Sequence, residues 1–334
     1  MRIIPVFTLG LLFQFITPVL PLQAQEPVQS AAERPVKGMW VWHFQTYSTA
    51  AERQRLLDFC REEGITLLLV QVHYALDPVT GVPTGMRDPQ AYGDLIEQAK
   101  RASITVEALE GDPKWPLPEW EKTWWPKFNV IMDWYNRQPP QRRFSGLHLD
   151  VEPYLLPDFD TREKWNILWL YVDFMDRVRK ELRRRGPELV FAADIPFWYD
   201  NFPKADEFLN HNVIEFNGAE KPASHHIQDI CDYIGIMSYR QHATGPNSIT
   251  RLCEEELAYA EKIGKKIFCG VEMSPDQDPP SISFYGTSVE LFREQTDLVY
   301  RTFGRRRGFG GLLIHYYNTY SAFLGKPLPE MTDG

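Results

Sequence analysis

The stretch FSGLHLDVEPY, residues 144–154, alternates apolar and polar side chains with the two-residue period of a β-strand. That period places the polar side chains of His148, Asp150 and Glu152 together on one face of the strand. Two neighbouring carboxyl groups on a buried face repel each other and are costly to ionise, unless the face opens into a polar cleft. The stretch therefore predicts a strand whose polar face leads into a functional cleft.

Apolar runs of strand length recur along the chain and alternate with amphipathic runs of helical length. The expected strands are GMWVWH (38–43), TLLLVQVHY (66–74), ITVEAL (104–109), GLHLDV (146–151), LVFAAD (189–194), YIGIMS (233–238), KIFCGV (266–271) and GLLIH (311–315). Eight such β/α units predict a single-domain α/β fold, a (β/α)8 TIM barrel, over residues 37–330. A doubly wound sheet is the alternative, but WVWHFQTYS after the first strand lacks the glycine of a phosphate-binding loop.

Several of the intervening helices have readable ends. The expected helices include one between the Ser48-Thr49 cap and Gly64, one that starts at Asp88-Pro89, and one over residues 161–185.

Composition limits the possible functions. The chain has 334 residues, of which 43% are hydrophobic and 24% charged, so it can bury a large core. Its formal net charge of −9 and isoelectric point near 5.5 argue against nucleic acid as a partner, because nucleic-acid binding generally needs a clustered basic surface.

The N-terminus predicts export. Arg2 precedes the apolar run IIPVFTLGLLFQFITPVL, which predicts a signal peptide over residues 1–24, cleaved after Ala24. A polar leader follows over residues 25–36. Pro5, Pro18 and Pro21 disfavour a persistent membrane-spanning helix, so we expect no stable membrane insertion after cleavage. The expected location is the periplasm or the exterior.

Four cysteines could pair in an oxidising compartment. Cys60 falls on the apolar side of an expected helix and Cys269 inside an expected strand, so we expect packing roles for the four, Cys60, Cys231, Cys253 and Cys269. No CxxC pair or Cys/His spacing predicts a zinc site, and no metal or cofactor is expected.

Nearly every expected strand ends in residues that can perform chemistry or hold a polar ring. In a TIM barrel such residues collect on one rim, where the βα loops begin. The residues selected as the candidate site are Trp42, His73, Tyr74, Trp115, His148, Asp150, Glu152, Tyr154, Asp194, Trp198, Met237, Tyr239, Arg240, Glu272, His315 and Tyr316. Acids surrounded by indoles and phenols are what glycosidic bond cleavage requires, since sugars present flat C–H faces to aromatic rings. The expected partner is therefore an oligo- or polysaccharide.

At strand geometry the Cα atoms of Asp150 and Glu152 are about 7 Å apart, close enough for one carboxylate to raise the pKa of the other. Glu152 is then able to remain protonated near neutral pH and to act as an acid. The alternative interpretation is that the pair holds Arg240 or another cation in a structural network.

Two of these strands resemble the signatures of glycoside hydrolase family 18, the group of chitinases and endo-N-acetylglucosaminidases. SGLHLDVEPY is similar to the DxxDxDxE signature of that family and IMSYR to its MxYD motif. The resemblance implies that Glu152 is the general acid/base and that Asp150 stabilises a substrate N-acetyl group acting as internal nucleophile, with retention. It also implies that Tyr239 binds the acetamide and that Met237 lines the pocket.

The chain departs from that family pattern at four positions. Ser145 and His148 stand in place of aspartates, Arg240 in place of the last aspartate of MxYD, and His315 in place of the tryptophan at the end of the eighth strand. The loss of that tryptophan, which normally lies under the reacting sugar, predicts a divergent relative with a different glycan.

Three other interpretations remain open. Glu272 follows the seventh strand, so it could be a covalent nucleophile about 5 Å from Glu152. A barrel that binds carbohydrate without catalysis would keep the same aromatic residues. A metal-dependent hydrolase could use His73, His148, Asp150 and His315, but no HxxxH or HxH pair supports it.

Overall fold

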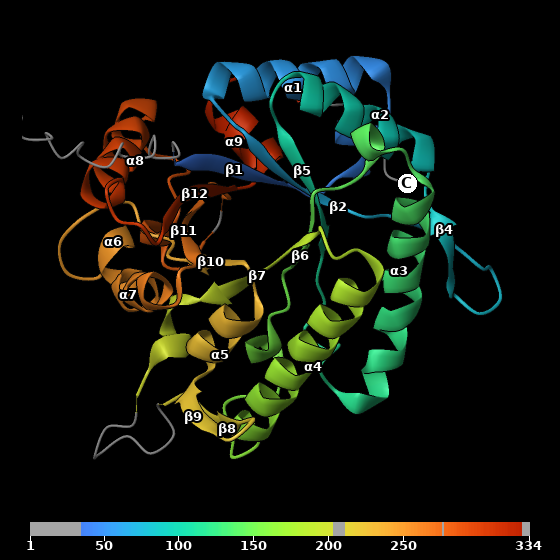
Figure 1. Cartoon of the computed structure of the whole chain (residues 1–334). Coiled ribbons are helices and arrows are strands. Elements are labelled where there is room, and N and C mark those ends of the chain that lie inside the picture. Colours follow the sequence, from blue (N-terminus) through green and yellow to red (C-terminus); the bar gives the residue numbers. More distant parts are fainter. Residues whose placement is uncertain (1–34, 203–210, 276, 329–334) are drawn as a thin grey trace, which may run out of the picture. The chain divides into compact units, whose positions relative to one another are not determined.

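The computed structural model describes residues 35–202, 211–275 and 277–328. Eight parallel strands form a closed barrel in the order β1-β12-β11-β10-β7-β6-β5-β2, with helices around it (Figure 1). The barrel strands are β1 (Val36–Val41), β2 (Leu67–Gln71), β5 (Thr105–Glu110), β6 (Gly146–Leu149), β7 (Val190–Pro196), β10 (Tyr233–Met237), β11 (Lys266–Glu272) and β12 (Phe309–His315). The predicted TIM barrel and its eight strands are confirmed.

Two short antiparallel hairpins were not expected. They are formed by β3 (Tyr74–Leu76) with β4 (Pro83–Met86), and by β8 (Val213–Phe216) with β9 (Ala219–Pro222). Each contains proline or glycine near its turn and alternates only briefly, so the period-2 signal is weak. The first hairpin takes Tyr74 out of the long run that was expected to be a single strand.

Two of the expected helices begin at their predicted caps, whereas the helix expected over residues 161–185 begins three residues later, at Lys164, without a side-chain cap. The Thr49 hydroxyl accepts the Glu52 N–H at the start of α1 (Ala50–Glu63), and Gly64 ends that helix with φ 69°. Asp88 caps α2 (Pro89–Arg101) through the Ala91 N–H. The remaining helices are α3 (Pro118–Arg137), α4 (Lys164–Arg185), α5 (Ala223–Ile230), α6 (Ile249–Leu252), α7 (Glu254–Ile263), α8 (Val289–Phe303) and α9 (Tyr317–Phe323). The 3-10 turns are η1 (Phe44–Thr46), η2 (Pro140–Arg142), η3 (Pro153–Leu155), η4 (Phe197–Asp200) and η5 (Pro280–Ile282).

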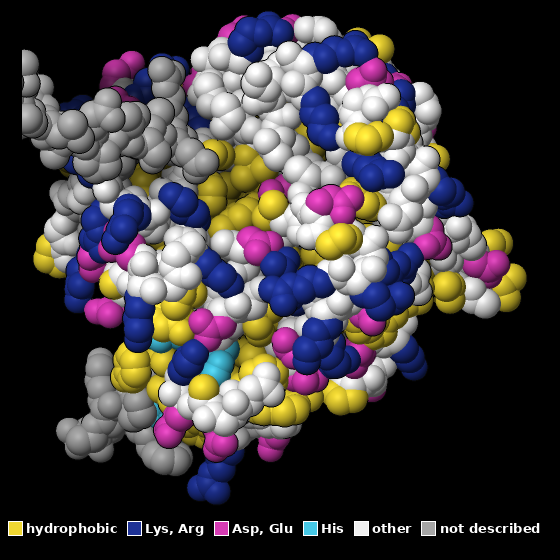
Figure 2. All heavy atoms as spheres, viewed as in Figure 1, with side chains coloured by type: hydrophobic (Ala, Val, Ile, Leu, Met, Phe, Trp, Pro, Cys, Tyr) yellow, Lys and Arg dark blue, Asp and Glu magenta, His cyan; other side chains and the backbone are white. Residues whose placement is uncertain are grey.

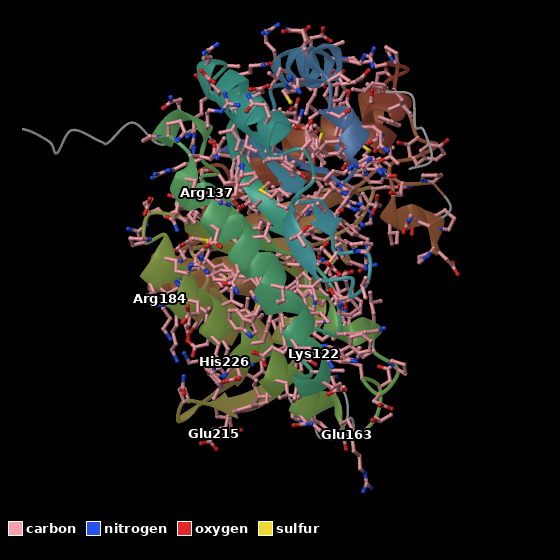
Figure 3. All side chains as sticks on the ribbon, turned by 90° about the vertical axis from the view of Figure 1, so that its right-hand side faces the viewer. Lys122, Arg137, Glu163, Arg184, Glu215 and His226 are labelled. Atoms are coloured by element: carbon pink, nitrogen blue, oxygen red, sulfur yellow. The ribbon has the colours of Figure 1, made fainter. Side chains whose placement is uncertain are left out.

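Helices α3 and α4 lie side by side and run in the same direction, as successive crossover helices of a parallel barrel must (Figures 1 and 3). Lys122 and Arg137 mark the two ends of α3, and Glu163 and Arg184 mark those of α4 (Figure 3). The Trp124 and Phe174 rings, 6.1 Å apart, join the two helices. The Arg185–Asp133 ion pair at 2.5 Å adds a second link.

Two layers of apolar side chains make up the core. The larger layer fills the space between the strands and the helices and includes Leu147 and Leu149 of β6. The smaller layer lies inside the barrel and consists of Trp40, Leu67, Leu69, Leu109, Ala192, Tyr233, Phe268 and Leu313. Since Leu147 and Leu149 face the helices, His148 faces the barrel interior, as the strand period predicts.

Charged side chains of both signs are interspersed over the face shown in Figure 2. Many of them pair between elements, such as Arg142 with Asp94 at 2.5 Å and Arg306 with Glu261 at 2.8 Å. The four cysteines are buried and free, in agreement with the packing roles expected for them. No helix among the described residues is long and apolar enough to cross a membrane. The predicted signal peptide (1–24) and most of the polar leader (25–36) lie outside the described residues.

Candidate active site

Asp150 and Glu152 lie just beyond the end of β6. The Asp150 N–H donates to Glu110 O at 2.8 Å, which extends the sheet pairing by one residue before the chain turns away. Gly111 makes that approach possible, because a Cβ atom there would lie 2.0 Å from the Asp150 carbonyl oxygen. Glu152 then adopts φ −112° and ψ 68° at the start of η3. Backbone geometry therefore places both acids, which are separated only by Val151, at the end of β6.

The electrostatic environment favours a proton on this acid pair. Burial, followed by the charges of Asp194 and Glu152, raises the pKa of Asp150 well above its usual range. Burial also raises the pKa of Glu152, although a hydrogen bond from Tyr154 opposes it, and Asp194 adds to the rise. Asp150 Oδ1 is buried without a hydrogen-bond partner among the described residues. The pair therefore retains a proton at a higher pH than free carboxyl groups would.

The Tyr239 side chain lies among the predicted catalytic acids. Its ring is accommodated by Gly270, where a Cβ atom would lie 3.0 Å from Tyr239 Cε1. Burial and then four carboxyl groups raise the pKa of its hydroxyl well above the usual range. Those groups are Glu272, Asp194, Asp150 and Glu152. The Tyr239 phenol therefore stays protonated and is available as a hydrogen-bond donor among the acids.

His315 lies between Trp42 and Glu272, and its hydrogen bonds to both fix one tautomer. The Trp42 indole N–H donates to His315 Nε2 at 3.0 Å, and an indole nitrogen cannot accept, so Nε2 is unprotonated. The imidazole proton is then on Nδ1, which donates to Glu272 Oε2 at 2.8 Å. The tryptophan expected at this position in family 18 is replaced by a neutral, oriented imidazole.

Glu272 is an anchored carboxylate. Its Oε1 accepts the N–H groups of Met273 at 2.8 Å and Ser274 at 2.6 Å, and its Oε2 accepts His315. Burial raises the pKa of Glu272, but the hydrogen bonds from His315 and Ser274 outweigh that effect and leave the pKa lowered. Both carboxylate oxygens are therefore occupied by N–H donors.

Aromatic and sulfur-containing side chains line the region next to the acid pair. The Tyr154 and Trp198 rings are 5.6 Å apart, and the Tyr154 hydroxyl lies 3.8 Å from Met237 Sδ. The Tyr316 ring is 5.0 Å from His315. Tyr154, Trp198 and Met237 therefore lie near one another, and Tyr316 lies beside His315.

Arg240 is held by neutral groups. Its Nε and Nη2 donate to Asn247 Oδ1 at 3.1 and 2.8 Å, and its guanidinium lies 5.2 Å from the Phe197 ring. No ion pair joins Arg240 to a carboxylate among the described residues, so this part of the structure does not support the structural network considered for Asp150 and Glu152.

Three predicted residues lie on the neighbouring side of the barrel. His73 Nε2 is 2.9 Å from Trp42 O, and the Lys127 ammonium lies 5.1 Å from both the Tyr74 and Trp115 rings. Trp115 is 1% exposed and packs on Trp124 with ring centroids 4.6 Å apart. Trp115 is therefore buried in the packing of its loop.

His148 and Asp194 are almost fully buried inside the barrel. Asp194 Oδ2 accepts the Trp40 indole N–H at 3.0 Å and lies 2.7 Å from His148 Nε2. Neither residue presents an open face to a ligand, and Asp194 raises the pKa values of the acid pair from the interior. Trp40 was not selected from the sequence, because it reads as an ordinary apolar residue of a strand.

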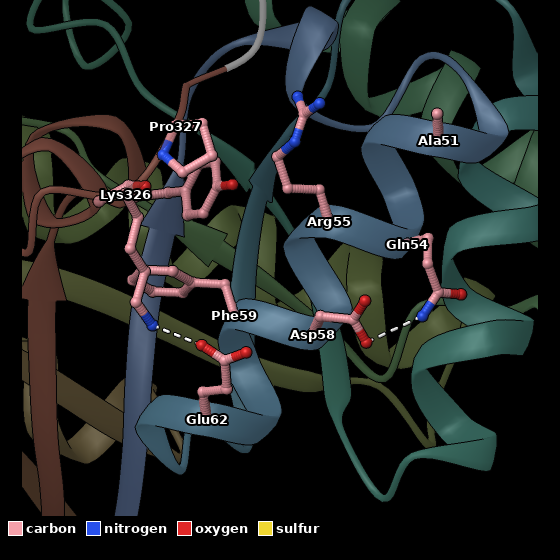
Figure 4. A pocket seen from close by; sticks show the side chains of 10 residues that line it. Ala51, Gln54, Arg55, Asp58, Phe59, Glu62, Lys326 and Pro327 are labelled. Atoms are coloured by element: carbon pink, nitrogen blue, oxygen red, sulfur yellow. Dashed lines mark hydrogen bonds and ion pairs between the residues drawn. The ribbon is translucent and has the colours of Figure 1, made fainter.

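No group of three His, Cys, Asp or Glu side chains within the described parts of the chain is arranged to hold a metal ion. A pocket of about 440 Å³ lies elsewhere, between α1 and the segment around α9 (Figure 4). Its polar side chains pair with one another, as in Gln54 with Asp58 at 2.9 Å and Lys326 with Glu62 at 2.7 Å. None of the predicted site residues lines it.

Comparison with known proteins gives similarity in structure but not in sequence. No protein-family model matches the chain, and no curated protein matches it. The endo-β-1,4-mannanase of Thermotoga petrophila has a TM-score of 0.56 at 13% identity, with 85% of this chain and 68% of that chain covered. The β-1,4-mannanase of the sea hare Aplysia kurodai has a TM-score of 0.54 at 12% identity, with 90% and 97% covered.

The spore cortex-lytic enzyme SleL of Bacillus megaterium is also similar, with a TM-score of 0.50 at 12% identity, covering 88% of this chain and 72% of that chain. At these identities the likeness shows the fold. The chain therefore has the TIM-barrel fold that these enzymes share, and its function has to be argued from the site.

Proposed function

We propose that the protein is an exported, retaining glycoside hydrolase that acts on a glycan containing an N-acetylhexosamine. The observation that carries the proposal is the acid pair beyond β6, in which the pKa values of both Asp150 and Glu152 are raised, next to the protonated Tyr239. The barrel fold shared with mannanases and SleL supports the same class of reaction.

In the proposed first step, Glu152 donates its proton to the glycosidic oxygen while the bond from that oxygen to the anomeric carbon breaks. The carbonyl oxygen of the substrate N-acetyl group attacks the anomeric carbon and forms a cyclic oxazolinium ion. Asp150 orients the acetamide N–H, and the Tyr239 hydroxyl donates to the acetamide oxygen. Water then opens the ring as the Glu152 carboxylate takes its proton, which gives net retention.

The second candidate uses Glu272 as a covalent nucleophile and needs no N-acetyl group. Its lowered pKa favours this role, because a nucleophilic carboxylate must be ionised. Its three N–H donors oppose it, since attack would require an oxygen to give up a hydrogen bond. A barrel that only binds carbohydrate is the third candidate, for which a raised pKa at Glu152 would have no use.

The test is the release of reducing ends from a panel of N-acetylated and non-acetylated glycans by wild type, Glu152→Gln and Asp150→Asn. We expect turnover on N-acetylated substrates only, and a loss of at least a hundredfold in kcat for Glu152→Gln, as for other positioned acids. Glu215→Gln, on the exposed hairpin β8–β9, makes the same chemical change outside the site and serves as the control.

Each outcome separates the candidates. Turnover of non-acetylated glycans that is lost in Glu272→Gln would assign the nucleophile to Glu272. Full activity of Glu152→Gln would overturn the acid assignment. Saturable binding without turnover by wild type would identify a binding protein. Export is tested by sequencing the N-terminus of the protein recovered from the periplasm or medium, where we expect it to begin at Gln25.

A further inference from the structure

A chain of buried polar side chains crosses the interior of the barrel beside the acid pair. Trp40 Nε1 donates to Asp194 Oδ2 at 3.0 Å, and Asp194 Oδ2 lies 2.7 Å from His148 Nε2. His148 Nδ1 lies 3.1 Å from the Tyr233 hydroxyl, which lies 2.8 Å from Glu107 Oε2. These five residues come from β1, β7, β6, β10 and β5, and each is at most 8% exposed.

Glycines in the neighbouring strands provide the space for these side chains. A Cβ atom at Gly235 would lie 2.1 Å from Asp194 Oδ1, and one at Gly146 would lie 2.8 Å from Glu107 Cδ. A barrel interior is normally filled by bulky apolar side chains, and buried charges do not stabilise a fold better than apolar packing does. The polar chain therefore needs an explanation other than stability.

Two arrangements of the protons fit these hydrogen bonds when Asp194 is a carboxylate. If the single Tyr233 hydroxyl proton goes to Glu107, His148 Nδ1 must donate to Tyr233, and a doubly protonated His148 lies between two carboxylates. If Glu107 instead carries the proton, it donates to Tyr233, which donates to a neutral His148. Both arrangements contain the same number of protons. In both, His148 Nε2–H donates to Asp194, which remains a carboxylate.

We infer that Glu107, Tyr233 and His148 are positioning residues that act through Asp194, keeping its carboxylate ionised so that the acid pair Asp150–Glu152 retains a proton. The inference rests on the proposed function for the use of that proton. Asp194 Oδ1 is buried and has no hydrogen-bond partner among the described residues, so its charge is not compensated on that side.

The electrostatic neighbours agree with this arrangement. Asp194 acts on the pKa of both Asp150 and Glu152 and raises it in each case. The other ionisable neighbours of the pair are the two acids themselves and His315. Burial raises the pKa of Glu107 to about 7, while His148 and Tyr233 lower it and Asp232 and Asp194 raise it. Glu107 therefore gains or loses its proton near neutral pH.

The first test reads the protonation of His148 in the full chain by NMR with ¹⁵N-labelled histidine. The signal of His148 is assigned among those of the eight histidines by its absence in His148→Gln. If His148→Gln does not fold, the signal that shifts in Tyr233→Phe gives the assignment. We expect Nε2 to carry a proton at every pH from about 5 to 8. An unprotonated Nε2 would mean that Asp194 donates the proton, and would overturn the inference.

The second test follows the Glu152 carboxyl carbon through a pH titration. Asp194→Asn removes the charge, and His148→Leu removes the donor that keeps Asp194 ionised. We expect the pKa of Glu152 to fall by about one unit in both variants. Leu109→Met, an apolar change within the same interior layer, should leave it unchanged. A Glu152 titration that moves in neither polar variant would show that the chain is only structural.

Neither measurement uses turnover. A lack of activity on the glycan panel would count against the proposed function. The NMR measurements on His148 and Glu152 would still test the positioning role of the buried chain.

Discussion

His315 stands where family 18 has a tryptophan, and its two hydrogen-bond partners give it a different role. Trp42 fixes its tautomer and Glu272 accepts its proton. Because Glu272 has a lowered pKa, its contribution to stability is present above the unfolded value of about 4.5 and is lost as the pH falls through the folded value.

We predict that His315→Ala lowers the free energy of unfolding by about 2 kcal/mol at neutral pH, because a buried carboxylate loses an N–H donor. The loss should be smaller at an acidic pH below the lowered pKa of Glu272, where this carboxyl group is protonated. Urea denaturation at the two pH values measures both quantities. His242→Ala, at an exposed histidine, is the matched control. An equal loss at both pH values would contradict the electrostatic explanation.

At the scale of the element, the interior glycines of the strands have a specific use. We predict that Gly235→Ala destabilises the protein by about 1 to 3 kcal/mol, since its methyl group would overlap Asp194 Oδ1. Gly85→Ala on β4 is the matched control, because nothing lies within 4 Å of a Cβ there. Thermal denaturation of the two variants compares them directly. Equal stabilities would mean that Asp194 moves aside without cost.

The elements of this fold could be predicted because their signals are local. Strands buried on both faces appear as apolar runs, and caps such as Thr49 and Gly64 mark the helix ends within one turn. The hairpins β3–β4 and β8–β9 could not be predicted, because strands of three or four residues carry too little periodicity.

The candidate site could be predicted only in part. Asp150, Glu152 and Tyr239 follow strands, and topology alone brings strand ends together. The partners of His148 are 85 and 46 residues away in sequence, so no local pattern shows them. The available signal was the glycine within YIGIMS, since an interior strand glycine indicates close approach of another group.

At the scale of the whole molecule, two buried acids contribute to the pH dependence of the free energy of unfolding. Burial raises the pKa values of Glu107 and Glu110 to about 7. A carboxyl whose folded pKa is raised binds protons more tightly in the folded state, so stability is lost as the pH rises from the unfolded value to the folded one.

We therefore predict that each of these acids contributes a decrease of up to about 3 kcal/mol in the free energy of unfolding between about pH 5 and pH 7.5. Glu110→Gln should reduce that slope, whereas the exposed Glu215→Gln should not. Chemical denaturation across the range provides the measurement. An unchanged slope in Glu110→Gln would show that Glu110 is already ionised in the folded protein over this interval.

The match between Gly235 and Asp194 also limits how this barrel can evolve. While the carboxylate is present, the glycine cannot acquire a side chain, and once the carboxylate is lost the vacated volume favours a larger residue at position 235. Gly146 is restricted further, because a Cβ atom there would also lie 2.9 Å from the Val190 carbonyl oxygen. Among homologous chains Gly235 and Asp194 should covary, and a lineage that has abandoned this chemistry should have filled the space at position 235.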